Sequence, residues 1–372
     1  MEPIRVLHVL GGLGLGGAES RIMDLYRSMD RSRVQFDFLI HTKNHDFYYD
    51  EVISLGGRVY SLLKFRGYNG SNYKKAVENF FQEHHDFKVV QGHMTSTASL
   101  YLPIAKKYNI PITIAHARSA GVDRGIKGLY TKWLRRNLYK KTDYCFACSA
   151  LAGEAVFGSA RVKKGLVTII PNAIDAGKFT FDPEKRMEMR QNLDISEKFV
   201  IGHVGRFDYM KNHTFLIDIF AELTKLQENV VLLLLGEGNE MQMIKDKANA
   251  LGIQSKILFL GNQGNPQDYY QTFDYFVFPS IFEGLPGTVV EAQAAGLRCL
   301  ISDTITSEVN ITSLVKNMSL KQSPAEWASY ILKTKYYKRN NMLNDIKEAG
   351  FDAANQAENM MTFYETGTFN LH

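Results

Sequence analysis

The 372-residue sequence contains only three cysteines and has no long apolar run. Three thiols cannot form the disulfide framework of a small secreted domain, which favours a reducing compartment. No stretch reaches the ~18 to 20 consecutive apolar residues that a membrane-spanning helix needs. The first ten residues also lack the cleavage pattern of a signal peptide. We therefore expect a cytoplasmic protein without a transmembrane segment.

Charge is divided unevenly along the chain. The net charge of the whole chain is +5, but residues 1–175 contain 25 basic and 15 acidic residues. The remainder contains 19 basic and 24 acidic residues. The first part therefore carries +10 and the second −5. This asymmetry indicates an anionic partner or surface for the first part.

Short apolar runs alternate with helical patterns in both halves, which is typical of parallel sheets built from βαβ units. In the first half, strands are expected at residues 4–10, 34–41, 88–90, 112–115, 144–147 and 166–170. In the second half, they are expected at residues 199–204, 230–235, 257–260, 275–278 and 299–302. The sequence thus predicts an α/β protein with two doubly wound, Rossmann-like domains facing a central cleft, residues 1–175 and 176–349. We expect the helical C-terminal segment, residues 350–372, to return to the first domain.

A glycine-rich turn joins the first expected strand to a helix. Gly12, Gly14 and Gly17 have the G-x-G-x-x-G spacing of a dinucleotide-binding loop, and Asp37 follows 20 residues later. Glycines let backbone N–H groups approach a phosphate, and the helix N-terminus favours an anion. Asp37, however, lies inside its expected strand instead of at the carboxyl end. A nicotinamide-dependent oxidoreductase and a turn without a ligand are both alternatives at this point.

Two basic residues follow the strand expected at residues 199–204. Arg206 and Lys211 lie in the loop between this strand and the next helix. Arginine offers a fork to two phosphate oxygens, and lysine offers a point charge. Such a pair could hold a diphosphate and stabilise it as a leaving group. Alternatively, both residues could be ordinary solvated cations at the surface.

Two glutamates follow the strand expected at residues 275–278. Glu283 lies in a Gly/Pro loop, and Glu291 lies in the first turns of the following helix. Gly284, Gly287 and the helix start present free N–H groups to an anion. Glu291 could accept hydrogen bonds from a ribose diol, and Glu283 could hold sugar hydroxyls. A helix-dipole partner and a surface carboxylate are the alternative readings.

Together these motifs resemble those of the retaining glycosyltransferases of family 4, which have the GT-B fold. The resemblance covers nearly the whole chain and includes GGAE from Gly16, PNAID from Pro171, VGR from Val204, GEG from Gly236 and the E-x7-E pair. It is closest to members that extend bacterial capsular or exopolysaccharide repeat units. It implies a hexosyltransferase-type enzyme with a nucleotide-diphosphate sugar donor, a UDP-sugar being expected. The implied acceptor is a saccharide or a lipid-linked saccharide, and no cofactor is expected.

The resemblance also implies roles for individual residues. The donor-binding residues would be Gly16, Gly17, Gly205, Arg206, Lys211, Glu283, Gly284, Leu285, Gly287 and Glu291. The catalytic candidates are His116, Arg206, Lys211 and Glu283, and the acceptor-side candidates are His93 and Arg118. Pro286 and Arg118 depart from the family pattern. The implied reaction is a front-face displacement in which the leaving phosphate helps to deprotonate the acceptor.

No D-x-D pair, the usual metal and nucleotide clamp of the other large glycosyltransferase fold, occurs in the sequence. Cationic side chains and N–H groups can replace a divalent ion beside a diphosphate. We therefore expect a metal-independent enzyme without a metal site. An NAD(P)-dependent oxidoreductase that uses the glycine-rich turn, and a non-catalytic nucleotide-sugar-binding module, are the alternative functions.

The segment from Arg124 to Lys141 contains seven basic residues and no acidic residue. Tyr130, Trp133, Leu134 and Leu138 alternate with the charges at roughly helical spacing. Such a helix could lie on an anionic membrane at the inner face of the plasma membrane. Alternatively, its apolar stripe could face the domain core. No recognition module for nucleic acid accompanies the basic residues, so we expect no nucleic-acid partner.

Overall fold

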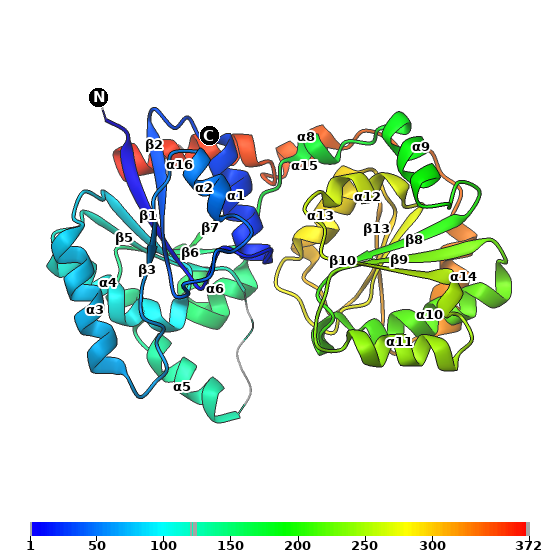
Figure 1. The fold of residues 1–372 in the computed structure, drawn as a ribbon, viewed down its shortest axis with the longest axis horizontal. Coiled ribbons are helices and arrows are strands. Elements are labelled where there is room, and N and C mark those ends of the chain that lie inside the picture. The colour runs from blue at the N-terminus through cyan, green and yellow to red at the C-terminus, as the bar shows by residue number, and fades with distance from the viewer. Residues whose placement is uncertain (1, 120, 122–124, 370–372) are drawn as a thin grey trace. The chain divides into compact units, whose positions relative to one another are not determined.

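The computed structural model describes residues 2–119, 121 and 125–369, and the chain divides into two compact units (Figure 1). The first unit comprises residues 1–173 and 353–372, and the second comprises residues 174–352. The chain therefore passes between the units twice, close to the predicted joins at residues 175 and 349. Each unit has its own parallel sheet and its own core.

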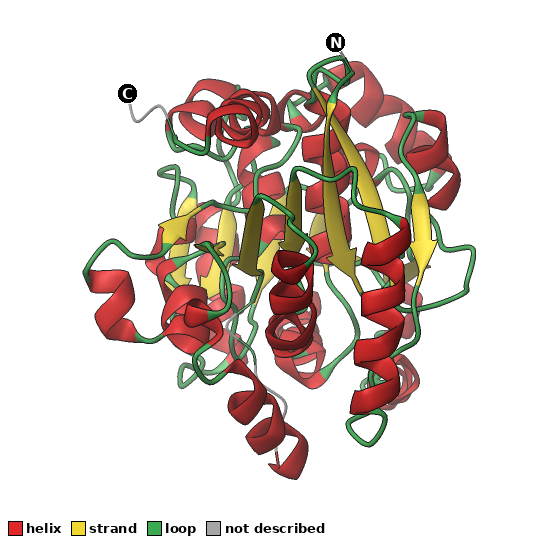
Figure 2. Cartoon of the chain, turned by 90° about the vertical axis from the view of Figure 1, so that its left-hand side faces the viewer, coloured by secondary structure: helices red, strands yellow, loops and turns green. Residues whose placement is uncertain are grey.

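The first unit is built on a seven-stranded parallel sheet with the order β3-β2-β1-β4-β5-β6-β7. Its strands are β1 (Ile4–Leu10), β2 (Val34–Ile40), β3 (Val59–Ser61), β4 (Val89–Gly92), β5 (Ile112–Ala117), β6 (Tyr144–Ala147) and β7 (Thr168–Ile169). Its helices are α1 (Gly17–Ser28), α2 (Tyr49–Ser54), α3 (Gly70–Glu83), α4 (Thr95–Lys107), α5 (Gly125–Arg135), η1 (Leu138–Lys140), α6 (Ala150–Phe157), α7 (Ser159–Lys163) and α16 (Ala353–Thr366). Figure 2 shows helices packed over the strands of this sheet.

The C-terminal helix α16 packs in the core of the first unit, against residues that are far from it in sequence. Met360, Phe363 and Tyr364 lie in one apolar cluster with residues of α1 and of the central strands. Arg33 forms ion pairs with Glu358 and Glu365 of the same helix, at 2.9 Å and 2.8 Å. Apolar burial together with two ion pairs therefore attaches this helix to the sheet.

The second unit is built on a six-stranded parallel sheet with the order β10-β9-β8-β11-β12-β13. Its strands are β8 (Phe199–Val204), β9 (Val230–Leu235), β10 (Ile257–Gly261), β11 (Tyr275–Phe278), β12 (Cys299–Ser302) and β13 (Val315–Met318). Its helices are α8 (Ala176–Phe179), α9 (Pro183–Asn192), η2 (Tyr209–Lys211), α10 (His213–Leu226), α11 (Met241–Ala250), η3 (Gln254–Lys256), α12 (Pro266–Thr272), α13 (Gly287–Ala294), η4 (Ser307–Val309), α14 (Pro324–Thr334) and α15 (Leu343–Glu348).

Strand β9 shows why the strands of this protein are continuous runs of apolar residues. Val231, Leu233 and Leu235 pack in a core with α8, α12, α13 and α15. The alternate residues, such as Leu232 and Leu234, pack in a second core with α10, α11 and α14. Because side chains alternate across a strand, a sheet covered on both faces needs apolar residues at every position. The predicted doubly wound α/β class is therefore confirmed.

The strand order reverses direction at one point in each sheet. In the first unit this switch lies between β1 and β4, and in the second it lies between β8 and β11. Loops that leave neighbouring strands at such a point diverge to opposite faces of the sheet, and ligands of doubly wound folds bind in the resulting crevice. Most of the predicted site residues follow these same strands, whereas His116 and Arg118 lie at the end of the neighbouring strand β5.

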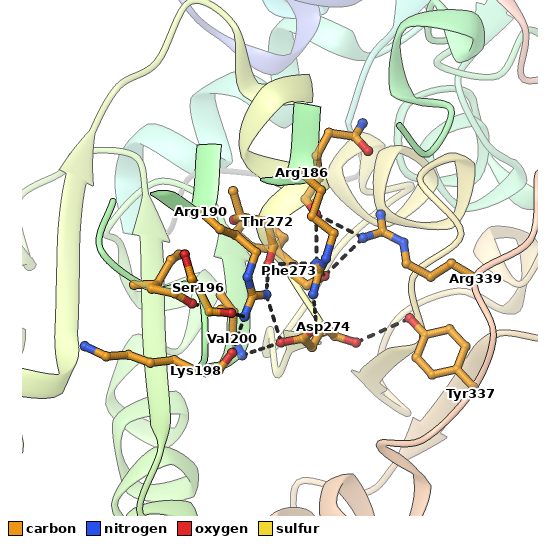
Figure 3. A network of polar contacts seen from close by, with 12 residues as sticks. Arg186, Arg190, Ser196, Lys198, Val200, Thr272, Phe273, Asp274, Tyr337 and Arg339 are labelled. Carbon is orange, nitrogen blue, oxygen red and sulfur yellow. Dashed lines mark hydrogen bonds and ion pairs between the residues drawn. The ribbon is translucent and has the colours of Figure 1, made fainter. Parts of the chain in front are cut away.

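A polar network holds the opposite, amino-terminal edge of the second sheet (Figure 3). The Asp274 carboxylate, directly before β11, accepts the Val200 backbone N–H at 2.7 Å and pairs with Arg186 and Arg190 of α9. Arg339 donates to the Phe273 carbonyl at 3.1 Å. Burial lowers the pKa of Arg339 to about 9. The network attaches both α9 and the segment around Arg339 to the base of the sheet.

Candidate active site

The charged residues predicted for the second unit meet at the carboxyl edge of β8 and β11, which are neighbours in the sheet. Arg206 and Lys211 follow β8, and Glu283 lies in the loop after β11. The Lys211 ammonium lies 2.7 Å from a Glu283 carboxylate oxygen and 4.7 Å from the centre of the Phe278 ring. Arg206 is exposed and has no ion pair within the described part of the chain. The fold thus pairs Lys211 with Glu283 and places Arg206 in the same loop as Lys211.

Hydrogen bonds hold the two loops of this edge against each other. The Ile281 N–H donates to the Met210 carbonyl at 2.8 Å, so the backbones of the loops are in contact. The Asn212 side chain donates to the Pro279 carbonyl at 3.1 Å. Lys211 stands between these two bonds along the chain, and its position relative to the β11 loop is therefore fixed by backbone contacts as well as by its ion pair.

The GEG motif forms a third loop, after β9, that packs against the backbone of the loop after β8. Gly236 has a φ of +127°, and a side chain there would clash with the Gly205 carbonyl oxygen. A side chain at Gly238 would clash with the Phe207 carbonyl oxygen. The Phe207 N–H donates to the Glu237 carbonyl at 3.0 Å. Close backbone approach therefore explains why both positions are glycine.

Glu291 lies in α13, where its side chain is buried and the residue is 4% exposed. The Tyr270 hydroxyl of α12 donates to its Oε2 atom at 2.8 Å. A buried carboxylate needs such a donor because desolvation disfavours its charged form. The ribose-binding role of Glu291 stays a prediction. Tyr270, which no spacing in the sequence singled out, is a hydrogen-bond donor to this carboxylate, and its hydroxyl also lies 3.1 Å from the Thr288 carbonyl oxygen.

Backbone atoms form most of the remaining predicted donor site in the second unit. Gly284 and Leu285 lie in the β11 loop, with Leu285 buried in the core. Pro286 occupies the N-cap position of α13, and Gly287 is its first residue. Proline has no N–H, so the first free donors of this helix belong to Gly287 and the residues after it.

In the first unit, the glycine-rich loop leads from β1 into α1, with Gly16 at the N-cap and Gly17 as the first helical residue. A side chain at Gly16 would clash with the carboxylate of Glu19, which folds back over the helix N-terminus. The Leu13 N–H donates to Asp46 at 3.1 Å. Acidic groups thus already face the loop, and a phosphate would compete with the Glu19 carboxylate for the helix end.

Asp37 is the acidic residue that a dinucleotide-binding site would use in this sequence. It is fully buried in the middle of β2. Its carboxylate pairs with Arg5 at 2.5 Å and with Arg58 at 2.8 Å, and it also accepts the Arg58 backbone N–H. A ribose-binding carboxylate would lie at the end of the strand and be accessible. The structure therefore gives Asp37 a role in joining β1, β2 and the start of β3, and removes the residue on which the nicotinamide alternative depends.

The predicted residues His93, His116 and Arg118 belong to one cluster at the carboxyl edge of β4 and β5. His93 Nε2 lies 2.9 Å from His8 Nδ1, and Arg118 donates to His93 Nδ1 at 3.2 Å and to Asn172 at 3.0 Å. Burial lowers the pKa of both predicted histidines well below the usual range, and the Arg118 charge adds to the effect. The rings are therefore neutral at physiological pH. Sequence reasoning had assigned no role to His8 or Asn172.

The basic segment divides its apolar residues between two environments. Arg124 lies outside the described residues. Trp133 of α5 is 64% exposed, and Tyr130 is also exposed, with its ring stacked on that of Trp133. Leu134 and Leu138 are buried in the unit. Each of the two alternatives for this segment therefore fits half of its apolar residues, because its two leucines pack inward while its two aromatic rings face solvent.

The described residues contain neither a candidate metal site nor a candidate membrane-spanning helix. Among them, no group of three His, Cys, Asp or Glu side chains is placed to hold a metal ion. No helix within the same residues is both long enough and apolar enough to cross a bilayer.

Comparison with known proteins agrees with this geometry. Residues 15–178 match the model of "Glycosyltransferase Family 4", and residues 185–351 match that of "Glycosyl transferases group 1". EpsF of Bacillus subtilis (strain 168), assigned to the glycosyltransferases, is 33% identical over 99% of this chain and 98% of its own. The capsular polysaccharide biosynthesis glycosyltransferase CapH of Staphylococcus aureus is 28% identical over 92% of this chain and 94% of its own.

A solved structure shares the fold over the whole length. The crystal structure of Anabaena Alr3699/HepE in complex with UDP has a TM-score of 0.77 and 16% sequence identity, and covers 98% of this chain and 100% of that one. The same protein is also known in complex with UDP-glucose. The two units, the loops at the strand switch points and the near full-length similarity agree: the chain belongs to the family 4, group 1 glycosyltransferases and has the GT-B fold.

Proposed function

We propose that this glycosyltransferase moves a hexose from a UDP-sugar to a saccharide or lipid-linked saccharide acceptor, with retention of the anomeric configuration. The observation that carries the proposal is the ion pair of Lys211 with Glu283 at the carboxyl edge of β8 and β11, with Arg206 in the same loop as Lys211. The UDP complexes of HepE support a uridine nucleotide. The name of CapH supports a role in the synthesis of an extracellular or capsular polysaccharide.

The proposed chemistry uses the cations of the second unit to stabilise the leaving group. Arg206 would place its guanidinium fork on phosphate oxygens, and Lys211 would exchange Glu283 for a phosphate as its anionic partner. Both charges oppose the negative charge that develops on the departing UDP. Glu283, released from Lys211, would then accept hydrogen bonds from sugar hydroxyls. Because two cations neutralise the diphosphate, we propose a metal-independent reaction.

The other residues suggested by the family resemblance supply orientation. Glu291, held by Tyr270, would bind the ribose, and the backbone from Gly284 to Gly287 would bind the sugar. In the first unit, Gly16 and Gly17 would approach the diphosphate, and His116 would lie near the sugar. His93 and Arg118 are proposed for the acceptor side. No residue of the second-unit site is proposed as a covalent nucleophile.

The test is the slow release of UDP or GDP from a panel of UDP- and GDP-hexoses, with and without EDTA. Wild-type protein should release UDP in both conditions. Arg206→Ala should lower kcat by at least about 100-fold, as for other donors that stabilise developing charge. The exposed Lys316, on β13, offers the matched control Lys316→Ala, which should turn over like wild type.

Three results would contradict the proposal. Wild-type turnover by Arg206→Ala would remove this arginine from the site, and loss of turnover in EDTA would require a metal. Thermal stabilisation by NADH but by no nucleotide sugar would restore the oxidoreductase alternative.

We further propose that the first unit contacts an anionic membrane surface, where a lipid-linked acceptor would be found. Leu129, Tyr130 and Trp133 of α5 are exposed, and the Tyr130 ring also stacks on Phe65 in the loop after β3, with ring centres 6.4 Å apart. Exposed aromatic rings beside Lys132 and other basic residues suit the headgroup region of such a membrane. Residues of two separate elements therefore contribute to one surface.

A further inference from the structure

A chain of buried hydrogen bonds connects the C-terminal helix to His116. The Tyr364 hydroxyl of α16 donates to Gln91 Oε1 at 2.6 Å, and Gln91 Nε2 lies 2.8 Å from His116 Nδ1. Gln91 belongs to β4, and His116 belongs to β5. All three residues are at most 1% exposed. The three polar groups therefore interact with each other and not with solvent.

The direction of this chain follows from the donors and acceptors available. Burial raises the pKa of the Tyr364 phenol, so this group keeps its proton. If the Gln91 amide were turned over, the Tyr364 proton would have no acceptor in a buried place, because the described residues offer it no other partner. The amide oxygen of Gln91 therefore accepts, and its nitrogen donates to His116 Nδ1. A neutral His116 that accepts at Nδ1 carries its proton on Nε2.

A second series of hydrogen bonds, from Arg118 through His93 to His8, runs in the same donor-to-acceptor direction. Arg118 is a donor only, so His93 Nδ1 must accept from it. His93 then carries its proton on Nε2 and donates to His8 Nδ1 at 2.9 Å. The His93 and His116 rings lie with their centres 5.4 Å apart. Two independent donors, the Gln91 amide oriented by Tyr364 and the Arg118 guanidinium, thus impose the same tautomer on adjacent imidazoles.

The proton on His116 Nε2 has no acceptor in the described structure. The atom is buried and makes no hydrogen bond. A buried donor without a partner is costly and rare in native structures. Such a donor, held in position by two further residues, is suited to a ligand that brings its own acceptor.

We propose that Tyr364 and Gln91 are positioning residues that hold His116 as its Nε2–H tautomer, so that this N–H donates to a hydroxyl oxygen of the donor sugar. The identity of the acceptor as a donor sugar rests on the proposed function. The tautomer itself rests only on the hydrogen bonds. The last helix of the chain, α16, therefore contributes to the site through a residue that does not touch the substrate.

The tautomer can be measured directly by NMR of the histidine ring nitrogens in the full-length protein, with His116 assigned by loss of its signals in His116→Gln. Wild type should show a protonated Nε2 and an unprotonated Nδ1. Gln91→Glu replaces the donor by a carboxylate that only accepts, so the proton should move to Nδ1. Tyr364→Phe keeps the ring, which packs on Phe36, but frees the amide to turn, so both tautomers should appear.

Tyr144→Phe is the matched control. Its hydroxyl donates to the Gly367 carbonyl at 2.9 Å, and its ring packs on Phe363 of the same C-terminal helix. This hydroxyl has no bond to Gln91, so the ring signals of His116 should stay as in wild type. A wild-type His116 protonated at Nδ1 would overturn the proposal. An unchanged tautomer in both Gln91→Glu and Tyr364→Phe would overturn it as well.

Release of UDP from UDP-glucose and other UDP-hexoses provides the functional measurement. Tyr364→Phe should lower kcat by about 3- to 10-fold, the effect of one weakened hydrogen bond, while Tyr144→Phe keeps the wild-type rate. A shifted tautomer with an unchanged rate would overturn the positioning role. If wild type releases UDP from no nucleotide sugar, the proposed function fails, while the NMR result still decides the tautomer.

Discussion

At the scale of single residues, the site of the second unit combines an exposed part with a buried part. Arg206 is exposed, and Lys211 and Glu283 are each 18% exposed, so a ligand can reach these charges from solvent. Glu291 differs because its carboxylate is buried and depends on a donor within the protein. Variants of the first group should therefore affect turnover alone, whereas variants around Glu291 should also affect stability.

We expect Tyr270→Phe to destabilise the folded protein by about 1 to 3 kcal/mol, because it leaves a buried carboxylate oxygen without the hydroxyl that donates to it. The phenylalanine ring can keep the contact of Tyr270 with Phe179. Urea unfolding followed by far-UV circular dichroism gives the change in free energy. The variant should also bind UDP more weakly if Glu291 binds the ribose.

The adjacent Tyr269 provides the control for this experiment. Its hydroxyl donates to Gln263 at 2.9 Å and its side chain is only partly buried. Tyr269→Phe should therefore cost less than about 1 kcal/mol, since water can replace the lost partner. Equal costs for the two variants would show that the bond to Glu291 has no special weight.

At the scale of elements, helix α5 exposes several large apolar side chains that do not pack in the core of the first unit. Leu129 is 68% exposed, and Trp133 and Tyr130 stand beside it, while Leu134 of the same helix is buried. One face of α5 thus packs on the unit, and the other presents apolar side chains among lysines and arginines. This pattern is typical of helices that lie in a membrane interface.

We expect the double variant Leu129→Ser and Trp133→Ser to lose at least about 10-fold in affinity for vesicles that contain anionic lipid, because two apolar anchors of about 1.5 to 3 kcal/mol each are removed. Co-sedimentation at low and high salt is the measurement. Leu226→Ser, at an exposed leucine that ends α10 in the second unit, is the control and should bind like wild type. Absence of wild-type binding at every salt concentration would leave α5 as an ordinary surface helix.

At the scale of the whole molecule, the buried parallel strands were the most predictable part of the fold. The strands β8, β9, β11 and β12 have the bounds expected from their apolar runs. Strands β3 and β13 were missed because they are short and mix polar with apolar residues, as in Val59–Ser61 and Val315–Met318. A short edge strand owes its position to its neighbour in the sheet, and its own sequence carries little signal.

By spacing alone, residues of the candidate site could be placed together only where one loop contains them, and the grouping of Lys211 with Glu283 came from the family resemblance. Arg206 and Lys211 share a loop, so the end of β8 sufficed to place them together. The Tyr364 to Gln91 bond joins residues 273 positions apart, and the His8 to His93 bond joins residues 85 apart. Sequence spacing cannot predict contacts between residues so far apart, because the packing of α16 and the order of the strands determine these contacts.

The distribution of buried histidines gives the two units different responses to acid. Burial lowers the pKa of His8 to about 3 and also lowers that of His41, His93 and His116, all in the first unit. In the second unit, burial lowers the pKa of His203 to about 4 and that of His213 to about 2. Because these folded values lie below that of an unfolded histidine, about 6.5, the unfolded chain binds protons first as the pH falls.

The stability due to these histidines is therefore fully present above about pH 6.5 and is lost below it at about 1.4 kcal/mol per pH unit for each ring, until the pH reaches the folded pKa of that ring. Four such rings lie in the first unit and two in the second. Carboxylates such as Glu365, whose pKa is lowered by its hydrogen bond to Arg33, lose their contribution only at lower pH.

We consequently expect the first unit to lose protection before the second when the pH is lowered from about 7 to about 5.5. Amide hydrogen exchange of the full chain, corrected for the intrinsic effect of pH on exchange, measures both units in one experiment. Peptides from β1, β4 and β5 should lose more protection than peptides from β8, β9 and β11. Equal losses, or an earlier loss in the second unit, would mean that the buried imidazoles of the first unit do not govern its response to acid.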